Sequence, residues 1–73
     1  MENWIKKDVI IDFDVPSSVQ YLIDLCEKAN SEEDYAYFNY EEALDYACKE
    51  LFATGHMTRK QWDTINERYE SYD

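Results

Sequence analysis

The sequence predicts an all-α fold, a compact three-helix bundle with helices near residues 16–29, 39–54 and 58–71. Three observations predict it. Apolar residues recur with the 3.6-residue helical period in three stretches. Capping residues mark where the second and third stretches begin, and Gly55, the only glycine, follows the second stretch. The 73 residues, of which 16% are aromatic, suit one small folded domain, 1–73, and not a disordered chain.

The N-terminal part of the chain predicts an extended or strand-like arm near residues 8–14. Apolar side chains occupy every second position there, at Val9, Ile11, Phe13 and Val15. A period of two residues is typical of a half-buried strand, and a strand needs a partner for its backbone groups. Three arrangements satisfy this pattern. The arm lies across the helices, which we favour, or it pairs with residues 35–38, or it pairs with its copy in a homodimer.

The first helix is expected to begin at Pro16, because proline suits a first helical turn, where its missing N–H is not needed. Its buried stripe consists of Val19, Leu22, Ile23, Cys26 and Ala29. Asn30 is the expected C-cap. The connection that follows contains Tyr35, Tyr37 and Phe38 and is too aromatic for a free loop, so these side chains should pack on the bundle.

The second and third helices are expected to form an αα-hairpin. Asn39 and Glu42 have the spacing of a capping box at the start of the second helix, and Thr58 and Gln61 have the same spacing at the start of the third. Gly55 is expected to end the second helix in a left-handed conformation. The apolar stripe of the second helix includes Leu44, Cys48 and Leu51. That of the third consists of Trp62, Ile65, Tyr69 and Tyr72.

Two stretches of the predicted hairpin resemble those of a known domain family. They are Glu50-Leu51 and the run Gly55-His56-Met57-Thr58-Arg59-Lys60-Gln61-Trp62. Through these residues, positions 49–69 resemble the short C-terminal (SHOCT-type) bacterial domain. The resemblance implies a two-helix unit used for association and not for catalysis. The chain as a whole is also similar to small uncharacterised proteins of bacterial mobile elements, which implies no particular activity.

The charge of the chain restricts its partners. Seventeen acidic residues against seven basic ones give a net charge of −10. Binding to nucleic acid or to an anionic membrane needs clustered lysine and arginine, so we expect neither. The acidic excess favours a basic protein partner, which includes nucleic-acid-binding proteins.

The sequence contains no constellation of catalytic residues, so we predict that the protein is not an enzyme. His56 is the only histidine and lies in the hairpin turn, and one glycine cannot make a phosphate-binding loop. No cysteine or histidine spacing predicts a metal site, and no cofactor is expected. Cys26 and Cys48 fall on apolar stripes and are predicted to be reduced core thiols of a cytoplasmic protein.

The leading prediction is a small non-enzymatic interaction or accessory protein that binds a protein partner through an acidic, tyrosine-rich face. In its most specific form, carboxylates would imitate DNA phosphates and inhibit a nucleic-acid-binding protein. The predicted partner-binding residues are Glu32, Glu33, Asp34, Tyr35, Tyr37, Glu41, Glu42 and Asp45. The alternative is a self-associating structural module, a homodimer formed through the N-terminal arm or the helical hairpin.

Overall fold

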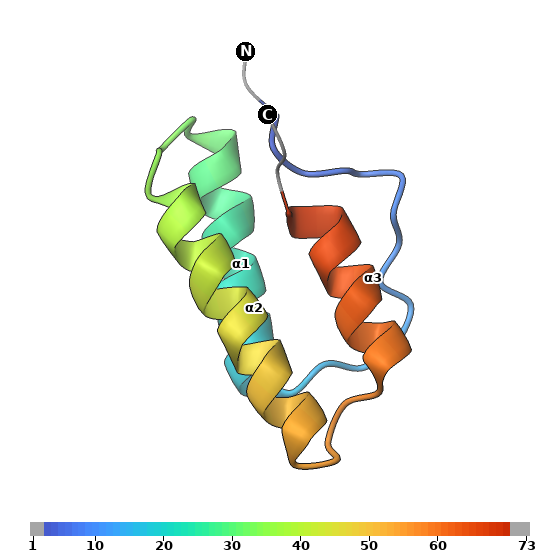
Figure 1. Ribbon diagram of the computed structural model, residues 1–73. Coiled ribbons are helices and arrows are strands. Elements are labelled where there is room, and N and C mark those ends of the chain that lie inside the picture. The colour runs from blue at the N-terminus through green and yellow to red at the C-terminus, as the bar shows by residue number, and fades with distance from the viewer. Residues whose placement is uncertain (1–2, 71–73) are drawn as a thin grey trace.

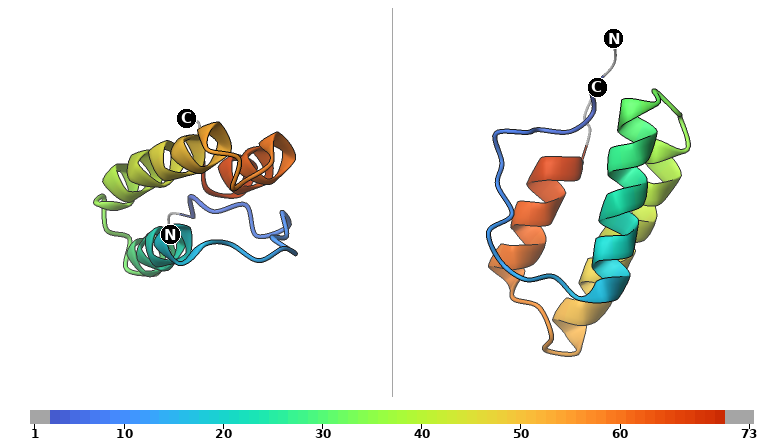
Figure 2. Two further views of the ribbon diagram at one scale, coloured as in Figure 1. Left: turned by 90° about the horizontal axis from the view of Figure 1, so that it is seen from below. Right: turned by 180° about the vertical axis from the view of Figure 1, so that it is seen from behind.

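The computed structural model describes residues 3–70, which contain three helices: α1 (Ser17–Ser31), α2 (Tyr37–Ala53) and α3 (Arg59–Tyr69) (Figure 1). No strand occurs in this part of the chain, so the all-α, three-helix prediction is confirmed. Seen end-on, α2 and α3 form one layer, and α1 and the N-terminal arm form a second layer beneath it (Figure 2). The arm therefore takes the place that a fourth helix would fill in a larger bundle.

A single apolar core lies between the two layers. Its buried residues come from the arm, all three helices and the hairpin turn: Ile5, Val19, Ile23, Cys26, Ala29, Tyr37, Leu44, Cys48, Met57, Ile65 and Tyr69. Both cysteines are free and completely buried, so their predicted place in the core is confirmed. The predicted stripe of α3 is confirmed at Ile65 and Tyr69, while Tyr72 lies outside the described residues.

The hairpin between α2 and α3 follows its predicted geometry. Gly55 is left-handed, with φ of 81°, and its N–H donates to the carbonyl oxygen of Phe52 at 3.1 Å. The N–H of His56 donates to the carbonyl oxygen of Leu51 at 2.8 Å, which completes a Schellman motif. At the start of α3, Thr58 and Gln61 exchange hydrogen bonds of 3.0 Å in both directions, so the capping box is confirmed.

The predicted capping box at Asn39 is wrong, because α2 begins at Tyr37, two residues before Asn39. Ala36 already has helical backbone angles, and its N–H donates to the side chain of Asp34 at 2.9 Å. The N–H of Asn39 donates to the carbonyl oxygen of Ala36 and is part of the first helical turn. The short-range turn at Asp34 thus starts the helix before Asn39 can cap it.

The end of α1 also differs from the prediction at Asn30, because the helix continues to Ser31 and ends in a second Schellman motif. Glu33 is left-handed, with φ of 54°, and its N–H donates to the carbonyl oxygen of Asn30 at 3.2 Å. The N–H of Asp34 donates to the carbonyl oxygen of Ala29 at 2.9 Å. A side chain at positive φ brings its Cβ close to the following carbonyl group, so this turn is locally strained.

Replacing Glu33 with glycine is therefore expected to stabilise the protein by about 1 kcal/mol, because glycine adopts the left-handed conformation without that crowding. The matched control is Glu32→Gly. Glu32 has φ of −93°, so glycine gains nothing there and costs about 0.5–1 kcal/mol in chain entropy. Urea unfolding of both variants measures the two effects. Equal destabilisation by the two changes would contradict the left-handed turn.

The N-terminal arm lies against the helices, as favoured, but it is not a continuous extended segment: the N–H of Val9 donates to the carbonyl oxygen of Lys6 at 3.1 Å, which closes a turn, and the chain bends again at Phe13. The arm is held at two points. The N–H of Trp4 donates to the side chain of the buried Asn30 at 2.8 Å. Farther along the arm, the Arg68 guanidinium donates to the carbonyl oxygen of Val9 at 2.8 Å, and the N–H of Lys6 donates to the carbonyl oxygen of Arg68 at 2.8 Å. The proposed pairing with residues 35–38 is wrong, because residues 37 and 38 belong to α2.

Candidate functional site

The turn between α1 and α2 carries half of the predicted partner-binding residues. Glu32, Glu33, Asp34 and Tyr35 are all exposed there. Farther along α2, Glu42 and Asp45 are exposed and Glu41 is half-buried. The structure therefore places seven of the eight predicted residues at least partly on the surface. The α1–α2 turn lies at the end of the molecule away from the α2–α3 hairpin (Figure 1), and the other three residues follow along α2 toward its middle.

Tyr37 is the exception, and its predicted place on the surface is wrong. Its side chain is completely buried, and its hydroxyl donates to the backbone carbonyl oxygen of Tyr69. Burial raises the pKa of this phenol well above its ordinary value of 10.0, and the nearby Cys26 thiol raises it further. Because α2 begins at Tyr37, this side chain turns into the core while Tyr35, two residues earlier in the turn, stays outside.

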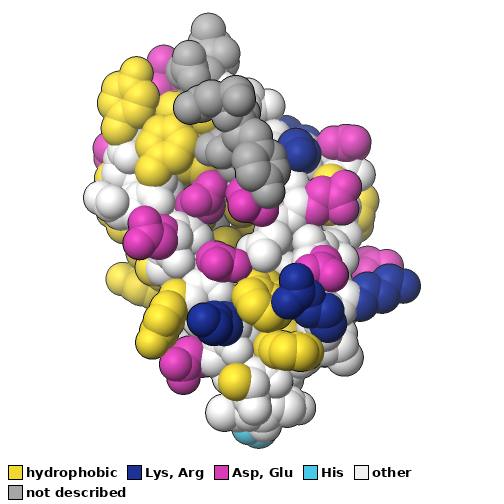
Figure 3. All heavy atoms as spheres, viewed as in Figure 1, with side chains coloured by type: hydrophobic (Ala, Val, Ile, Leu, Met, Phe, Trp, Pro, Cys, Tyr) yellow, Lys and Arg dark blue, Asp and Glu magenta, His cyan; other side chains and the backbone are white. Residues whose placement is uncertain are grey.

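An aromatic cluster lies beside the acidic turn. Trp4, Tyr35 and Phe38 form the cluster, which we call the aromatic end. The ring centre of Trp4 lies 5.8 Å from that of Tyr35 and 5.0 Å from that of Phe38. The side chain of Tyr35 is 73% exposed and that of Phe38 is 37% exposed. Figure 3 shows hydrophobic side chains at this end of the face, next to a group of acidic side chains, with most of the basic ones nearer the hairpin.

The contribution of Trp4 could not be expected from the sequence spacing, because Trp4 is distant in the chain from the two other aromatic residues. Its position depends on Asn30, a polar residue with 9% exposure at the end of α1. The Asn30 side chain accepts from the N–H of Trp4 at 2.8 Å and donates to the side chain of Asn3 at 3.2 Å. A buried polar group needs such partners, so Asn30 fixes the arm where Trp4 can join the cluster.

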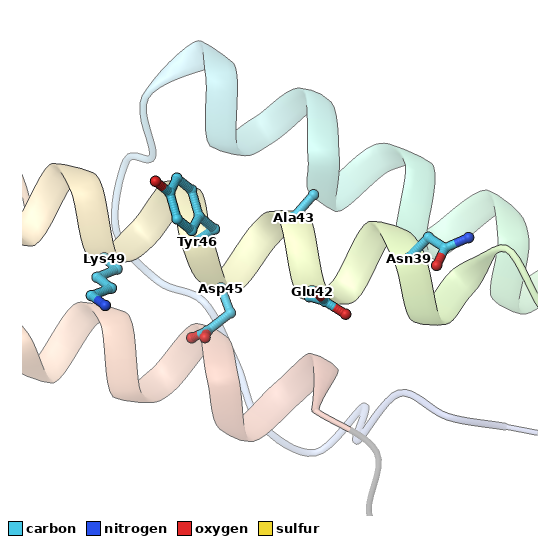
Figure 4. Close-up of a pocket in the computed structure, with 6 residues that line it drawn as sticks. All are labelled: Asn39, Glu42, Ala43, Asp45, Tyr46 and Lys49. Atoms are coloured by element: carbon cyan, nitrogen blue, oxygen red, sulfur yellow. The ribbon is translucent and has the colours of Figure 1, made fainter.

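The outer face of α2 forms a shallow hollow of about 510 Å³ (Figure 4). The residues that line it are Asn39, Glu42, Ala43, Asp45, Tyr46 and Lys49. All of them belong to one helix, so the hollow is an open surface and not an enclosed cleft in which water could be excluded from a reaction. Asp45 also accepts from the indole N–H of Trp62 at 2.9 Å, so this carboxylate joins α2 to α3.

The thiols of Cys26 and Cys48 are ionisable groups of the core, and burial raises the pKa of both. Burial, with the nearby carboxylates Glu41 and Glu27, raises the pKa of the Cys26 thiol from 9.0 to about 12. Burial and the carboxylate of Asp45 raise that of Cys48 from 9.0 to about 11. A thiol with a raised pKa is a poor nucleophile. No group of three or more potential metal ligands occurs within residues 3–70.

These raised pKa values predict that the protein loses stability in alkaline solution. The two thiols ionise near pH 9 in the unfolded chain, but they stay neutral until about pH 11 to 12 in the folded protein. Their contribution to the free energy of unfolding is therefore complete below pH 9 and is lost as the pH rises above 9. Each group contributes a slope of up to about 1.4 kcal/mol per pH unit. Urea unfolding between neutral and strongly alkaline pH measures the loss, which should be shallower in a Cys48→Ala variant. A stability that stays constant across this range would contradict the buried, neutral thiols.

Comparison of the chain with protein-family models, with curated proteins and with solved structures gave no match. Within the described residues, each helix is too short or too polar to cross a bilayer. The functional argument therefore depends on the surface itself, whose main features are the aromatic end and the neighbouring carboxylates.

Proposed function

We propose that the protein is a small, non-enzymatic interaction protein that binds a basic segment of a protein partner at the aromatic end. The observation that carries this proposal is the cluster of the exposed Tyr35 and Phe38 with the half-buried Trp4, directly beside the acidic α1–α2 turn. The two free core thiols suit the reducing cytoplasm, where we place the protein.

The aromatic rings supply the contact area. Tryptophan and tyrosine are enriched at the centres of protein interfaces, because they offer a large rigid surface and lose little conformational entropy on binding. Tyr35 and Phe38 are stacked with their ring centres 6.4 Å apart and an angle of 17° between their planes. This arrangement presents a flat apolar surface on which the stem of a lysine or the guanidinium of an arginine can lie.

The neighbouring carboxylates supply the selectivity for a basic partner. Between Lys28 and Lys49 the chain carries no basic residue and has the acidic residues Glu32, Glu33, Asp34, Glu41, Glu42 and Asp45. A surface with one sign of charge attracts the opposite charge and accelerates association. A nucleic-acid-binding protein is a specific case of such a partner, because its basic groove is built to accept a row of anions. For that case we expect DNA to compete with the protein.

Affinity capture from host lysate, performed with matched variants, tests this function. We expect Tyr35→Ala and Glu32→Lys each to abolish capture of the specific partner. Two control variants should retain it. Tyr21→Ala removes a tyrosine that is 65% exposed on α1, and Glu67→Lys makes the same charge change on α3. Loss of capture with both charge-reversal variants but with neither tyrosine variant would indicate general charge attraction and contradict the proposed site. Loss with all four variants would contradict it as well.

Self-association is the alternative outcome. A capture experiment that recovers only untagged copies of the same chain, without dependence on salt, would support the homodimer in place of a basic partner. Surface charges are screened within about 10 Å at 0.1 M salt, so a partner attracted by charge should be released at high salt and an apolar homodimer should not.

A further inference from the structure

Arg59 lies on an aromatic ring at the hairpin between α2 and α3. Its guanidinium carbon is 4.4 Å from the ring centre of Trp62. The ring of Phe52 packs against that of Trp62, with the ring centres 5.5 Å apart and an angle of 39° between the planes. The Nε–H of Arg59 donates to the carboxylate of Asp63, the residue after Trp62, at 3.0 Å. This cation is therefore held by a ring under its face, a second ring beside the first and a carboxylate at its edge.

The aromatic end has a similar pair of rings with carboxylates beside it. The ring centres of Trp4 and Tyr35 lie 5.8 Å apart with an angle of 45° between the planes. Glu33 and Asp34 directly precede Tyr35 in the turn and are exposed. The N–H of Ala36 donates to the Asp34 carboxylate at 2.9 Å, which holds this side chain in the turn. The Tyr35 side chain is 73% exposed, and no arginine or lysine of the described residues lies over its ring.

We infer that the aromatic end selects an arginine of the partner over lysine and methylated lysine, with the guanidinium stacked on Tyr35 and bonded to a carboxylate of the turn. The inference rests on the function proposed above and names the residue of the basic segment that enters the site. A guanidinium is planar and weakly hydrated, so one of its faces can lie on a ring while its edge donates two parallel hydrogen bonds to a carboxylate.

The spacing of the rings does not suit an ammonium group. An ammonium group is strongly hydrated, and aromatic cages bind methylated lysine by surrounding it with rings. The guanidinium at the hairpin lies 4.4 Å from one ring centre, so two nearly parallel rings must be about 9 Å apart to hold a cation between them. The ring centres of Tyr35 and Phe38 are only 6.4 Å apart, with 17° between the planes, and those of Trp4 and Phe38 are 5.0 Å apart. A cation can therefore lie on the outer surface of these rings but not between them.

The test measures the binding of three peptides with blocked termini to the full-length protein by calorimetry. Each peptide alternates glycine with one cationic residue, which is arginine, lysine or trimethyllysine, so the three peptides carry equal charge. We expect the arginine peptide to bind at least about fivefold more tightly than either of the others. In NMR spectra, the side-chain protons next to the bound guanidinium should move upfield, because they lie above an aromatic ring.

Two variants at Tyr35 test whether its ring gives the selectivity. Tyr35→Phe keeps the ring, so we expect it to keep both the preference for arginine and the upfield shift. Tyr35→Leu keeps an apolar side chain but removes the ring, so we expect it to bind the arginine and lysine peptides equally. The Tyr35 side chain is 73% exposed, so both variants should retain the fold.

The possible results separate this inference from the proposed function. Equal binding of the arginine and lysine peptides would overturn the inference and leave the proposed function standing. Tighter binding of the trimethyllysine peptide would do the same, because it would indicate a cage. A preference for arginine that persists in the Tyr35→Leu protein would also overturn the inference, because the carboxylates alone would then select the guanidinium. Failure of all three peptides to bind would overturn both the inference and the proposed function.

Discussion

Replacing Tyr37 with alanine is expected to destabilise the protein by about 3–5 kcal/mol, the usual cost of removing a buried aromatic ring. The side chain is completely buried, and its hydroxyl satisfies the carbonyl oxygen of Tyr69 at the end of α3. A domain of this size has only about 3–5 kcal/mol of net stability. Most of the Tyr37→Ala protein should therefore be unfolded at room temperature, as measured by circular dichroism and urea titration.

The matched control for this change is Tyr35→Ala, only two residues away. Tyr35 is 73% exposed, so its removal should change the free energy of unfolding by no more than about 0.5–1 kcal/mol. The two variants thus separate a tyrosine that stabilises the fold from one that is available to a partner. Similar stabilities for the two variants would contradict the burial of Tyr37.

Replacing Arg68 with alanine is expected to cost about 2–3 kcal/mol, because it removes charge-assisted hydrogen bonds that join three segments. The guanidinium bonds to the carbonyl oxygen of Val9 at 2.8 Å, to the Glu27 carboxylate at 3.3 Å and to the Tyr69 hydroxyl at 3.1 Å. Only 17% of the Arg68 side chain is exposed, so water replaces these bonds poorly. Urea unfolding measures the cost, and faster hydrogen exchange at the amides of Lys6 and Val9, which donate the backbone hydrogen bonds of this part of the arm, should show the arm released.

Lys60→Ala is the control for Arg68. It removes a positive charge from the exposed face of the same helix, where the expected change is within about 0.5 kcal/mol. Arg68→Lys should restore only part of the stability, because an ammonium group cannot reach several acceptors with the geometry of a guanidinium. Equal stabilities of the Arg68→Ala and Lys60→Ala proteins would contradict the role of Arg68 in holding the arm.

The features that the sequence predicts correctly depend on neighbouring residues. The capping box of Thr58 and Gln61 and the left-handed Gly55 follow from interactions within one turn of the chain, and sequence patterns report such interactions directly. The buried stripes of the helices follow from the helical period in the same way. These local rules are sufficient to predict three helices and the burial of both cysteines.

The features that were missed depend on contacts between distant segments. Asn39 has the right spacing for a cap, but the turn at Asp34 starts the helix earlier. Arg68 is a charged residue of the kind usually found on the surface, yet its guanidinium binds the Val9 carbonyl oxygen in the arm and the Glu27 carboxylate in α1. The same limit applies to the binding surface. The acidic turn could be predicted from composition, whereas Trp4 joins Tyr35 only through the buried side chain of Asn30.

The emission of Trp4 gives the most direct test of the proposed binding surface. The chain has two tryptophans, so a Trp62→Phe protein reports from the aromatic end alone. We predict that a peptide of alternating arginine and glycine changes the Trp4 emission saturably, and that its affinity falls at least about tenfold between about 50 mM and 500 mM salt. Tyr35→Ala should abolish the change. A Trp4 emission that is unaffected by the peptide, or affected equally in the Tyr35→Ala protein, would contradict binding of a basic segment at the aromatic end.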